Sequence, residues 1–138
     1  MIKLIIAGGR DFNDYELAEP RILSWCTHMV ATSSSDLVIL SGCASGADRI
    51  GERFADEYDV TVDLYPAKWK DLDVPGAIIK SNRYGEYNAK AGFDRNALMA
   101  ANATHLIAFW NGTKKNSGTY SMIKLAEEHG LPTVIVKY

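Results

Sequence analysis

The chain has 138 residues, 47% of them hydrophobic and 23% charged, a composition typical of a soluble globular protein that buries its own core. Its 15 Lys and Arg against 17 Asp and Glu give a formal net charge of −2. This balance disfavours a dedicated duplex-DNA binder, because such proteins carry a basic surplus. The length predicts a single domain that spans residues 1–138.

The cysteines and the first residues of the chain indicate the cellular compartment in which the protein is expected. The two cysteines, Cys26 and Cys43, lack the spacing of a metal site, so we expect neither a bound metal nor a disulfide framework. The opening run MIKLIIAGGRDF is too short for a signal peptide or a membrane span. We therefore expect a cytoplasmic protein with no membrane partner.

Residues 1–67 predict three strands with a helix between each pair. Short branched apolar runs that end at glycine, serine or proline are typical of strands buried in a parallel sheet. Pro20 suits a first helical turn better than a helix interior, so the first helix is expected to begin near Glu19. The expected strands are residues 3–7, 36–40 and 60–67, and the apolar helix faces are Ala18, Ile22, Trp25, Cys26 and Met29, then Ile50, Phe54 and Tyr58.

Residues 68–138 predict two more helices and two more strands. Residues 68–93 are the least readable part, rich in Gly and Pro, and are expected to hold a helix, a lid or both. Asp94 is expected to cap the next helix, and Gly130 is expected to end the last helix in a left-handed conformation. The expected helices are residues 95–103 and a segment with its apolar face at Thr119, Met122, Ile123 and Ala126; the expected strands are residues 105–110 and 132–138.

The alternation of strands and helices implies right-handed crossovers and a mainly parallel sheet. The predicted fold class is therefore α/β, a three-layer sandwich around a mainly parallel sheet of five or slightly more strands. In such sheets ligands bind beyond the carboxyl ends of the strands. Three of these strand ends carry small residues, in the segments GGRDF (8–12), SGCASGAD (41–48) and NGTKKNSGT (111–119).

Small residues at the start of a helix have two interpretations. Glycine permits tight turns, and it also lets an anion approach the unpaired N–H groups and the positive dipole of a helix N-terminus. Three such turns at one edge of a sheet favour an anion-binding cleft. Neither the P-loop triplet Gly-Lys-Ser/Thr nor the G-x-G-x-x-G fingerprint is present at these turns.

Six segments occur in an order that resembles the SLOG superfamily, in particular its small single-domain branch related to YpsA-type proteins of bacteria and their viruses. They are AGGRDF, SGCASGADRIGERFA, YPAKW, AGFDRNALMA, HLIAFWNG and SGTYSMIKLAEEHGLPTVIV. The resemblance implies a Rossmann-like fold, and it implies a sensor or binding module for a nucleotide-type ligand such as AMP, ADP-ribose or an NAD derivative. It also implies a homodimer, because related proteins often self-associate.

Two more distant branches of the superfamily leave other functions open. Phosphoribohydrolases of the LOG type cut the N-glycosidic bond of nucleoside monophosphates, and a DNA-uptake processing protein contacts single-stranded DNA, which is the less favoured alternative here. Gly118 and Thr119 match the phosphoribohydrolase motif, but Ser121 and Met122 occupy the positions of its paired glutamates. Whether the chain is an enzyme therefore stays open, with Glu52 and Asp48 as substitute catalytic carboxylates. The arginine beside that motif's phosphate corresponds to Arg95.

Several candidate residues also have a structural interpretation. Arg10 could brace its loop by an ion pair with Asp11 or Asp48 instead of clamping an anion, and Arg95 could be a surface cation beside Asp94. Asp48 suits the first turn of a helix, Glu52 could pair with Arg49 or Arg53, and Trp110 could pack in the core instead of stacking on a base. The candidate ligand-binding residues are Gly8, Gly9, Arg10, Ser41, Gly42, Ser45, Gly46, Ala47, Arg95, Asn96, Trp110, Asn111, Gly112, Ser117, Gly118 and Thr119.

Overall fold

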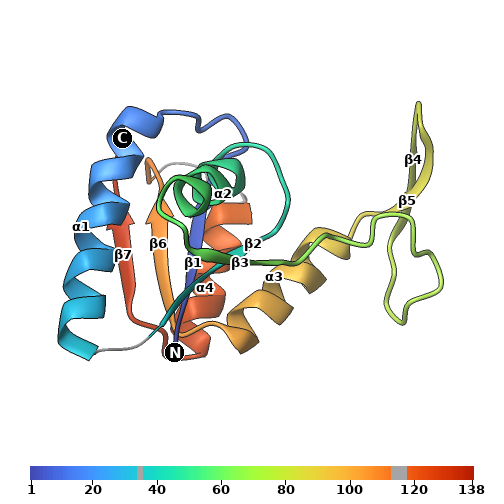
Figure 1. The fold of residues 1–138 in the computed structure, drawn as a ribbon. Helices are drawn as coiled ribbons and strands as arrows, with labels where there is room; N and C mark the ends of the chain where they lie inside the picture. Colours follow the sequence, from blue (N-terminus) through green and yellow to red (C-terminus); the bar gives the residue numbers. More distant parts are fainter. Residues whose placement is uncertain (34–35, 113–117) are drawn as a thin grey trace.

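A computed structural model describes residues 1–33, 36–112 and 118–138 of the chain (Figure 1). Its main sheet has five strands in the order β3-β2-β1-β6-β7, and all four neighbouring pairs are parallel. The elements are β1 (Ile2–Gly8), α1 (Tyr15–Ser33), β2 (Leu37–Ser41), α2 (Ala47–Glu57), β3 (Thr61–Leu64), β4 (Ile79–Asn82), β5 (Gly85–Asn88), α3 (Ala91–Asn102), β6 (His105–Phe109), α4 (Gly118–Glu128) and β7 (Thr133–Val136).

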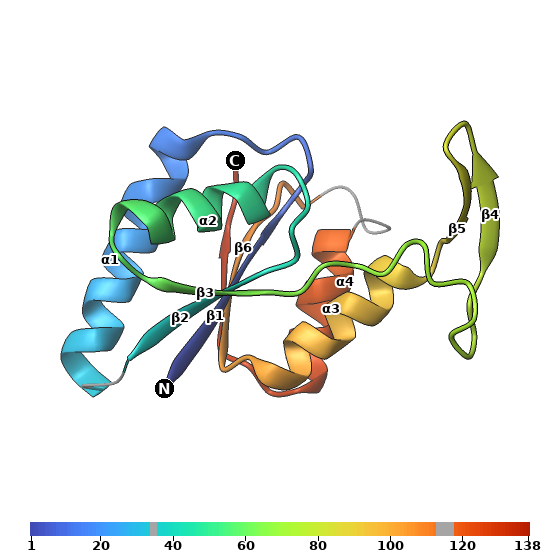
Figure 2. The same cartoon turned by 45° about the vertical axis from the view of Figure 1, so that its right-hand side comes forward.

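The helices cover the sheet on both faces, with α1 and α2 on one side and α3 and α4 on the other (Figure 2). Successive side chains of β1 point to opposite faces, so Leu4 and Ile6 join the cluster under α1 and α2 while Ile5 joins the cluster under α3 and α4. The predicted three-layer α/β fold is therefore confirmed. Within the described parts of the chain, no helix combines the length and the apolar character that crossing a lipid bilayer requires.

The strand order reverses at β1, and this reversal positions the site. The chain passes from β1 outward to β2 and β3, then returns to place β6 on the other side of β1. Gly8 at the end of β1 is in register with Phe109 at the end of β6. In open parallel sheets, the point where strand order reverses leaves a crevice at the carboxyl ends. The turns that follow β1, β2 and β6 all start at this edge.

The predicted start of the first helix is wrong. Helix α1 begins at Tyr15 instead of near Glu19 and contains Pro20 in its interior. The carboxylate of Asp14 accepts a hydrogen bond from the backbone N–H of Leu17 (3.1 Å), which caps the first turn. This cap lets the helix start one turn earlier, so that Pro20 removes one backbone hydrogen bond from the second turn.

For the last two helices, the predicted start of α3 is wrong and the predicted end of α4 is confirmed. Helix α3 begins at Ala91, before Asp94, and its N-cap residue Lys90 makes no side-chain capping bond. Asp94 instead lies in the first turn, with a carboxylate oxygen 3.8 Å from Nζ of Lys90. Gly130 has a φ of 68°, so the predicted left-handed end of the last helix is confirmed.

Residues 71–89, here called the arm, project from the body of the protein (Figure 1). A helix or a lid was expected in this region, but β4 and β5 form a separate antiparallel hairpin. The buried side chain of Asn88 accepts hydrogen bonds at Oδ1 from the backbone N–H groups of Ile78 (3.1 Å) and Lys90 (3.0 Å). The backbone N–H of Asn88 donates to the carbonyl of Trp69 (2.7 Å). Asn88 therefore fixes the base of the arm beside the start of α3.

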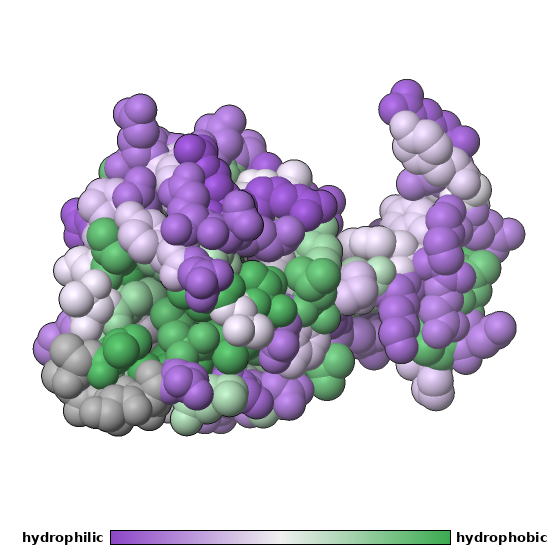
Figure 3. Space-filling model, viewed as in Figure 1, coloured by the Kyte–Doolittle hydropathy of each residue, from purple (hydrophilic) through white to green (hydrophobic). Residues whose placement is uncertain are grey.

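The arm carries both apolar and polar surface. Figure 3 shows it as a separate lobe with purple and green atoms side by side. Ile78, Ile79 and Tyr84 are exposed on it, whereas its contacts with the body run through Trp69 and the first turn of α3. Trp69 therefore contacts both the base of the arm, through Asn88, and the first turn of α3, at Gly92.

Candidate functional site

A cavity of about 520 Å³ lies at the carboxyl edge of the sheet, where the strand order reverses. Its floor comes from β1, and its walls come from the turns after β1, β2 and β6 and from the first turns of α3 and α4. We call it the main cavity. The residues around it that carry polar side chains or exposed backbone amides include Gly8, Gly9, Arg10, Asp11, Ser45, Asp48, Arg95, Asn96, Asn111, Gly118 and Thr119.

Two glycines, Gly8 and Gly46, allow close packing at this edge of the sheet. Gly46 has a φ of 78°, and a Cβ there would overlap the carbonyl oxygen of Gly9 and lie 2.8 Å from Cα of Arg10. A Cβ on Gly8 would lie 2.8 Å from Cβ of Ala47. The loops after β1 and β2 therefore pack backbone against backbone, which brings Arg10 and Ser45 to the same wall.

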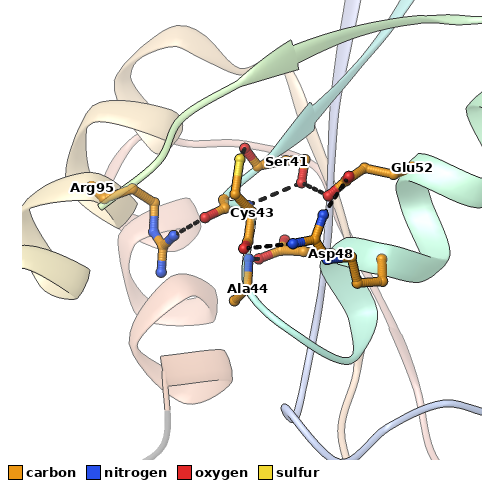
Figure 4. A network of polar contacts seen from close by, with 8 residues as sticks. Ser41, Cys43, Ala44, Asp48, Glu52 and Arg95 are labelled. Atoms are coloured by element: carbon orange, nitrogen blue, oxygen red, sulfur yellow. Dashed lines mark hydrogen bonds and ion pairs between the residues drawn. The ribbon is translucent and has the colours of Figure 1, made fainter. Parts of the chain in front are cut away.

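The loop after β2 is held by side chains of α2 (Figure 4). Asp48 accepts a hydrogen bond from the N–H of Ala44 (3.1 Å). The hydroxyl of Ser41 donates to Glu52 (2.7 Å) and accepts from the N–H of Cys43 (3.1 Å). These bonds support Cys43, whose φ of 62° lies in the left-handed region that costs a non-glycine residue strain. The loop is thus fixed independently of any ligand.

The two candidate catalytic carboxylates differ in position. Glu52 forms an ion pair with Arg49 (2.8 Å), accepts from Ser41 and lines neither cavity described here. Its pairing with Arg49 agrees with the structural interpretation. Asp48 does line the main cavity, and burial raises the pKa of its carboxyl above the ordinary value, while N–H donors and Arg95 partly oppose that shift.

Arg95 reaches across from α3 to the loop after β2. Its guanidinium donates to the carbonyl of Gly42 through Nη1, and its Nε donates to Asn96 (2.9 Å). Among the described residues, no hydrogen-bond partner occurs at its Nη2. Burial lowers the pKa of Arg95, Asp48 raises it, and the positive charge of Arg10 lowers it further. Arg95 is thus a half-buried cation that lines the main cavity together with Arg10.

Arg10 is exposed at the end of the β1 loop. Its guanidinium carbon lies 5.9 Å from the centre of the Trp69 ring, within the range of a cation–π contact. No ion pair within 4.0 Å joins it to Asp11 or Asp48, all three being residues that the structure describes. The bracing ion pair considered for Arg10 is therefore not formed.

Aromatic side chains line the other parts of the main cavity. Trp110 is half-buried and packs against Tyr120, with 5.6 Å between ring centres; its indole N–H is buried with no hydrogen-bond partner in the described part of the chain. Phe93 and Tyr138 also line the cavity and were missed from the sequence. The strand-end rule could have found Tyr138, because it follows β7 at the same edge.

A second cavity of about 380 Å³ adjoins the main one. Five residues line both and form what we call the shared wall: Arg10, Ala44, Ser45, Trp69 and Arg95. The second cavity is completed by Gly42, Cys43, Pro66 and Ala67, from the loops after β2 and β3. Sequence reasoning missed Pro66 and Ala67, although the segment YPAKW lies at a strand end.

The structure gathers most of the predicted site residues and separates the others. Ten line the main cavity, namely Gly8, Gly9, Arg10, Ser45, Arg95, Asn96, Trp110, Asn111, Gly118 and Thr119. Gly42 lines the second cavity, whereas Ser41, Gly46, Ala47 and Gly112 line neither. Ser117 lies outside the described residues.

Comparison with known proteins identifies one family. A family model for the YspA, cpYpsA-related SLOG family matches residues 2–71, just over half of the chain. The match includes Arg10, the loop after β2 and Trp69, whereas Arg95 and α4 lie beyond it. A comparison with curated proteins gave no match. The chain therefore belongs to the YspA, cpYpsA-related SLOG family.

Proposed function

We propose that the protein binds a nucleotide or nucleotide-derived anion at the carboxyl edge of its sheet, as a sensor or ligand-binding module. One observation carries the proposal: the only charged residues of the shared wall are Arg10 and Arg95. A guanidinium is a planar donor suited to phosphate. Membership of the SLOG family, which suggests a nucleotide-related ligand, supports the same conclusion.

The surroundings of the shared wall support a nucleotide more than a simple anion. Aromatic and apolar side chains, among them Phe93, Trp110 and Met122, line the main cavity beyond the arginines. Ligand pockets usually combine such walls with a few polar groups that fix orientation. A phosphate beside Arg95 would leave a ribose and a base to occupy the aromatic part of the cavity.

Calorimetric titration with AMP and with adenosine tests the proposal. AMP should bind more tightly than adenosine, and Arg95→Met should weaken AMP binding at least about tenfold, because a charge-assisted hydrogen bond is lost. Arg21→Met is the matched control, since Arg21 is exposed on α1 and lines neither cavity. Equal binding of AMP and adenosine, or an unchanged affinity in Arg95→Met, would contradict an anion site.

A second candidate function is hydrolysis of an N-glycosidic bond with Asp48 as the acid. It is favoured by the position of Asp48 in the main cavity and by its raised pKa. It is disfavoured by Met122, which presents an apolar side chain to the cavity where the phosphoribohydrolase motif has a carboxylate. Incubation with AMP and with NAD, followed by chromatography, separates the candidates. Turnover lost in Asp48→Asn but retained in Glu52→Gln would support hydrolysis, and the absence of product would support binding alone.

A further inference from the structure

We propose that two copies of the chain form a two-fold dimer by exchanging arms, so that the arm of each copy packs on helix α3 of the other at the mouth of the main cavity. The proposal goes beyond the proposed function, because it does not depend on which ligand the cavity binds. Two exposed apolar surfaces carry it: the hairpin of the arm and the outer face of α3.

The hairpin of the arm has little packing of its own. A two-stranded hairpin is only marginally stable in water unless it packs against a helix or further strands. All four residues of β4 are exposed, and among the described elements β4 and β5 pack extensively only on each other. Ile78, Ile79 and Tyr84 are 51%, 44% and 72% exposed. The hairpin therefore presents apolar side chains that a helix of another molecule can cover.

Helix α3 has apolar side chains towards solvent as well as towards the sheet. Met99 is buried, whereas Phe93 and Leu98 are 53% and 55% exposed. A surface helix normally has a polar outer face, and apolar residues all round are typical of a buried helix. The outer face of α3 consists of the exposed residues Phe93, Ala97 and Ala101, which follow at intervals of four, and Leu98 beside them. We therefore expect a second surface to cover this face.

The surface area of the molecule agrees with a second copy as the occupant. The accessible surface is 7916 Å², which is about 800 Å² above the roughly 7,100 Å² expected for a compact protein of 15.2 kDa. The arm that stands clear of the body in Figure 3 accounts for such an excess. Each partner in a stable complex buries about 800 Å², so the excess is of the size that a dimer would bury.

Symmetry and charge favour contact of the arm with α3 of the second copy. The arm leads directly into α3, so a two-fold axis near their junction lets each copy give an arm and receive one. Residues 79–88 of the hairpin carry Lys80 and Arg83 against Glu86, whereas Asp94 is the only charge at the exposed positions of α3. Opposite charges favour this pairing over contact between two arms.

The exchange would also bring the second copy to the main cavity. Phe93 belongs to the outer face of α3 and lines the main cavity. An arm that covers this face would therefore cover the rim of the cavity at Phe93. In the dimer, each main cavity would then be bordered by both copies.

Sedimentation velocity tests the two surfaces. The unchanged chain should be a dimer, and Ile79→Asp in the arm and Leu98→Asp on α3 should each weaken dimerisation at least about tenfold, because a charge would be buried among apolar side chains. Leu64→Asp is the matched control and should have no effect, because Leu64 is 60% exposed on β3 at the edge of the sheet. Tyr84→Asp and Ala101→Asp serve where the first variants do not fold.

A mixture of the two variants tests the exchange itself. In a pair made of one Ile79→Asp copy and one Leu98→Asp copy, one arm and the α3 face that receives it are both unchanged. The mixture should therefore dimerise more tightly than either variant alone. Contacts of arm with arm and of α3 with α3 leave no such unchanged contact in the mixture, so a mixture that gains nothing overturns the proposal.

Hydroxyl-radical labelling of the unchanged chain needs no variant. Labelling of Phe93, Leu98 and Tyr84 should fall severalfold as the protein concentration rises through the dissociation constant of the dimer, and labelling of Leu64 should stay constant. Equal protection of Leu64, or a loss of the dimer in Leu64→Asp, overturns the proposal. A chain that is monomeric at all concentrations also overturns it and would leave the arm and α3 to a different partner.

Discussion

At the scale of single residues, the position of Gly46 suits only glycine, because of its backbone conformation and because of the space around it. Its φ of 78° disfavours residues with a Cβ, and the space of that Cβ is taken by the backbone of Gly9 and Arg10. We predict that Gly46→Ala lowers the free energy of unfolding by at least about 2 kcal/mol, since backbone strain and steric overlap add. Urea denaturation measures this change.

Gly130→Ala is the matched control for that prediction. Gly130 has a φ of 68°, but a Cβ there would meet nothing within 4 Å. Only the conformational cost applies, about 1 kcal/mol. Similar losses in the two variants would mean that the contact between the loops after β1 and β2 contributes nothing to stability.

Asp48 and Glu57 are predicted to affect stability with opposite pH dependence. Burial raises the pKa of Asp48 above 3.8, so its contribution to stability is complete below that pH and is lost as the pH rises through the folded-state pKa. A hydrogen bond from Tyr15 lowers the pKa of Glu57 below 4.5, so its contribution is present above that pH and is lost as the pH falls.

Both effects can be measured by urea denaturation of Asp48→Asn and Glu57→Gln between about pH 3 and pH 7. This range includes the ordinary pKa values of carboxyl groups. Relative to the unchanged protein, Asp48→Asn should become more stable as the pH rises, because the asparagine avoids a buried charge and keeps an oxygen that can accept from Ala44. Glu57→Gln should become less stable as the pH rises. Parallel trends in the two variants would contradict the assignment.

At the scale of elements, the arm depends on Asn88. This side chain is 1% exposed and accepts the N–H groups of both Ile78 and Lys90. Asn88→Ala leaves both donors without their acceptor, at a cost of about 1 kcal/mol for each of these part-buried hydrogen bonds. We predict that amide hydrogen exchange between Trp69 and Lys90 accelerates at least about tenfold, while exchange in β1 and β6 is unchanged.

The control for the arm is Asn82→Ala at the tip of the hairpin. Asn82 is exposed, and its side chain accepts only the N–H of Tyr84 (2.8 Å) among the bonds that the structure describes for it. Exchange should accelerate at the hairpin turn alone. Equal acceleration over the whole arm in both variants would show that Asn88 is not the residue that fixes the base of the arm.

The elements also show where sequence patterns are reliable. Apolar runs that end at turn residues predicted all five strands of the main sheet. Strands β1, β2 and β6 are mostly buried, which leaves them few polar positions, whereas the edge strands β3 and β7 are mostly exposed. The predicted start of α1 is too late, because it rests on Pro20 alone, whereas the helix is capped earlier by Asp14, whose carboxylate accepts from the N–H of Leu17. The hairpin of β4 and β5 was not predicted, because its exposed strands carry no periodic apolar pattern.

At the scale of the whole molecule, the homodimer expected from the SLOG resemblance stays a prediction. Apolar side chains are exposed on separate elements, including Leu64 of β3, Ile78 before β4 and Leu98 of α3, and such surface favours association where it is contiguous. Sedimentation velocity should give twice the chain mass of 15.2 kDa. A single species of 15.2 kDa would contradict the dimer.

The sequence alone determined the α/β class and the turns from which the candidate site is built. Period-two and period-3.6 patterns are local, and the strand-end rule assigns Gly8, Ser45 and Gly118 to one edge once the strands are parallel. The sequence did not determine the role of each small residue. In the structure, Gly46 and Ala47 pack between the loops, whereas Ser45 lines the cavities.

Only the tertiary structure decided which side chains share a wall. Arg10, Trp69 and Arg95 are far apart in sequence, and their meeting depends on the order of the strands, the early start of α3 and the base of the arm. It also decided that the cavity has a second part, bordered by Pro66 and Ala67. Local patterns specify the elements, but the relative placement of distant elements follows from packing that no short segment encodes.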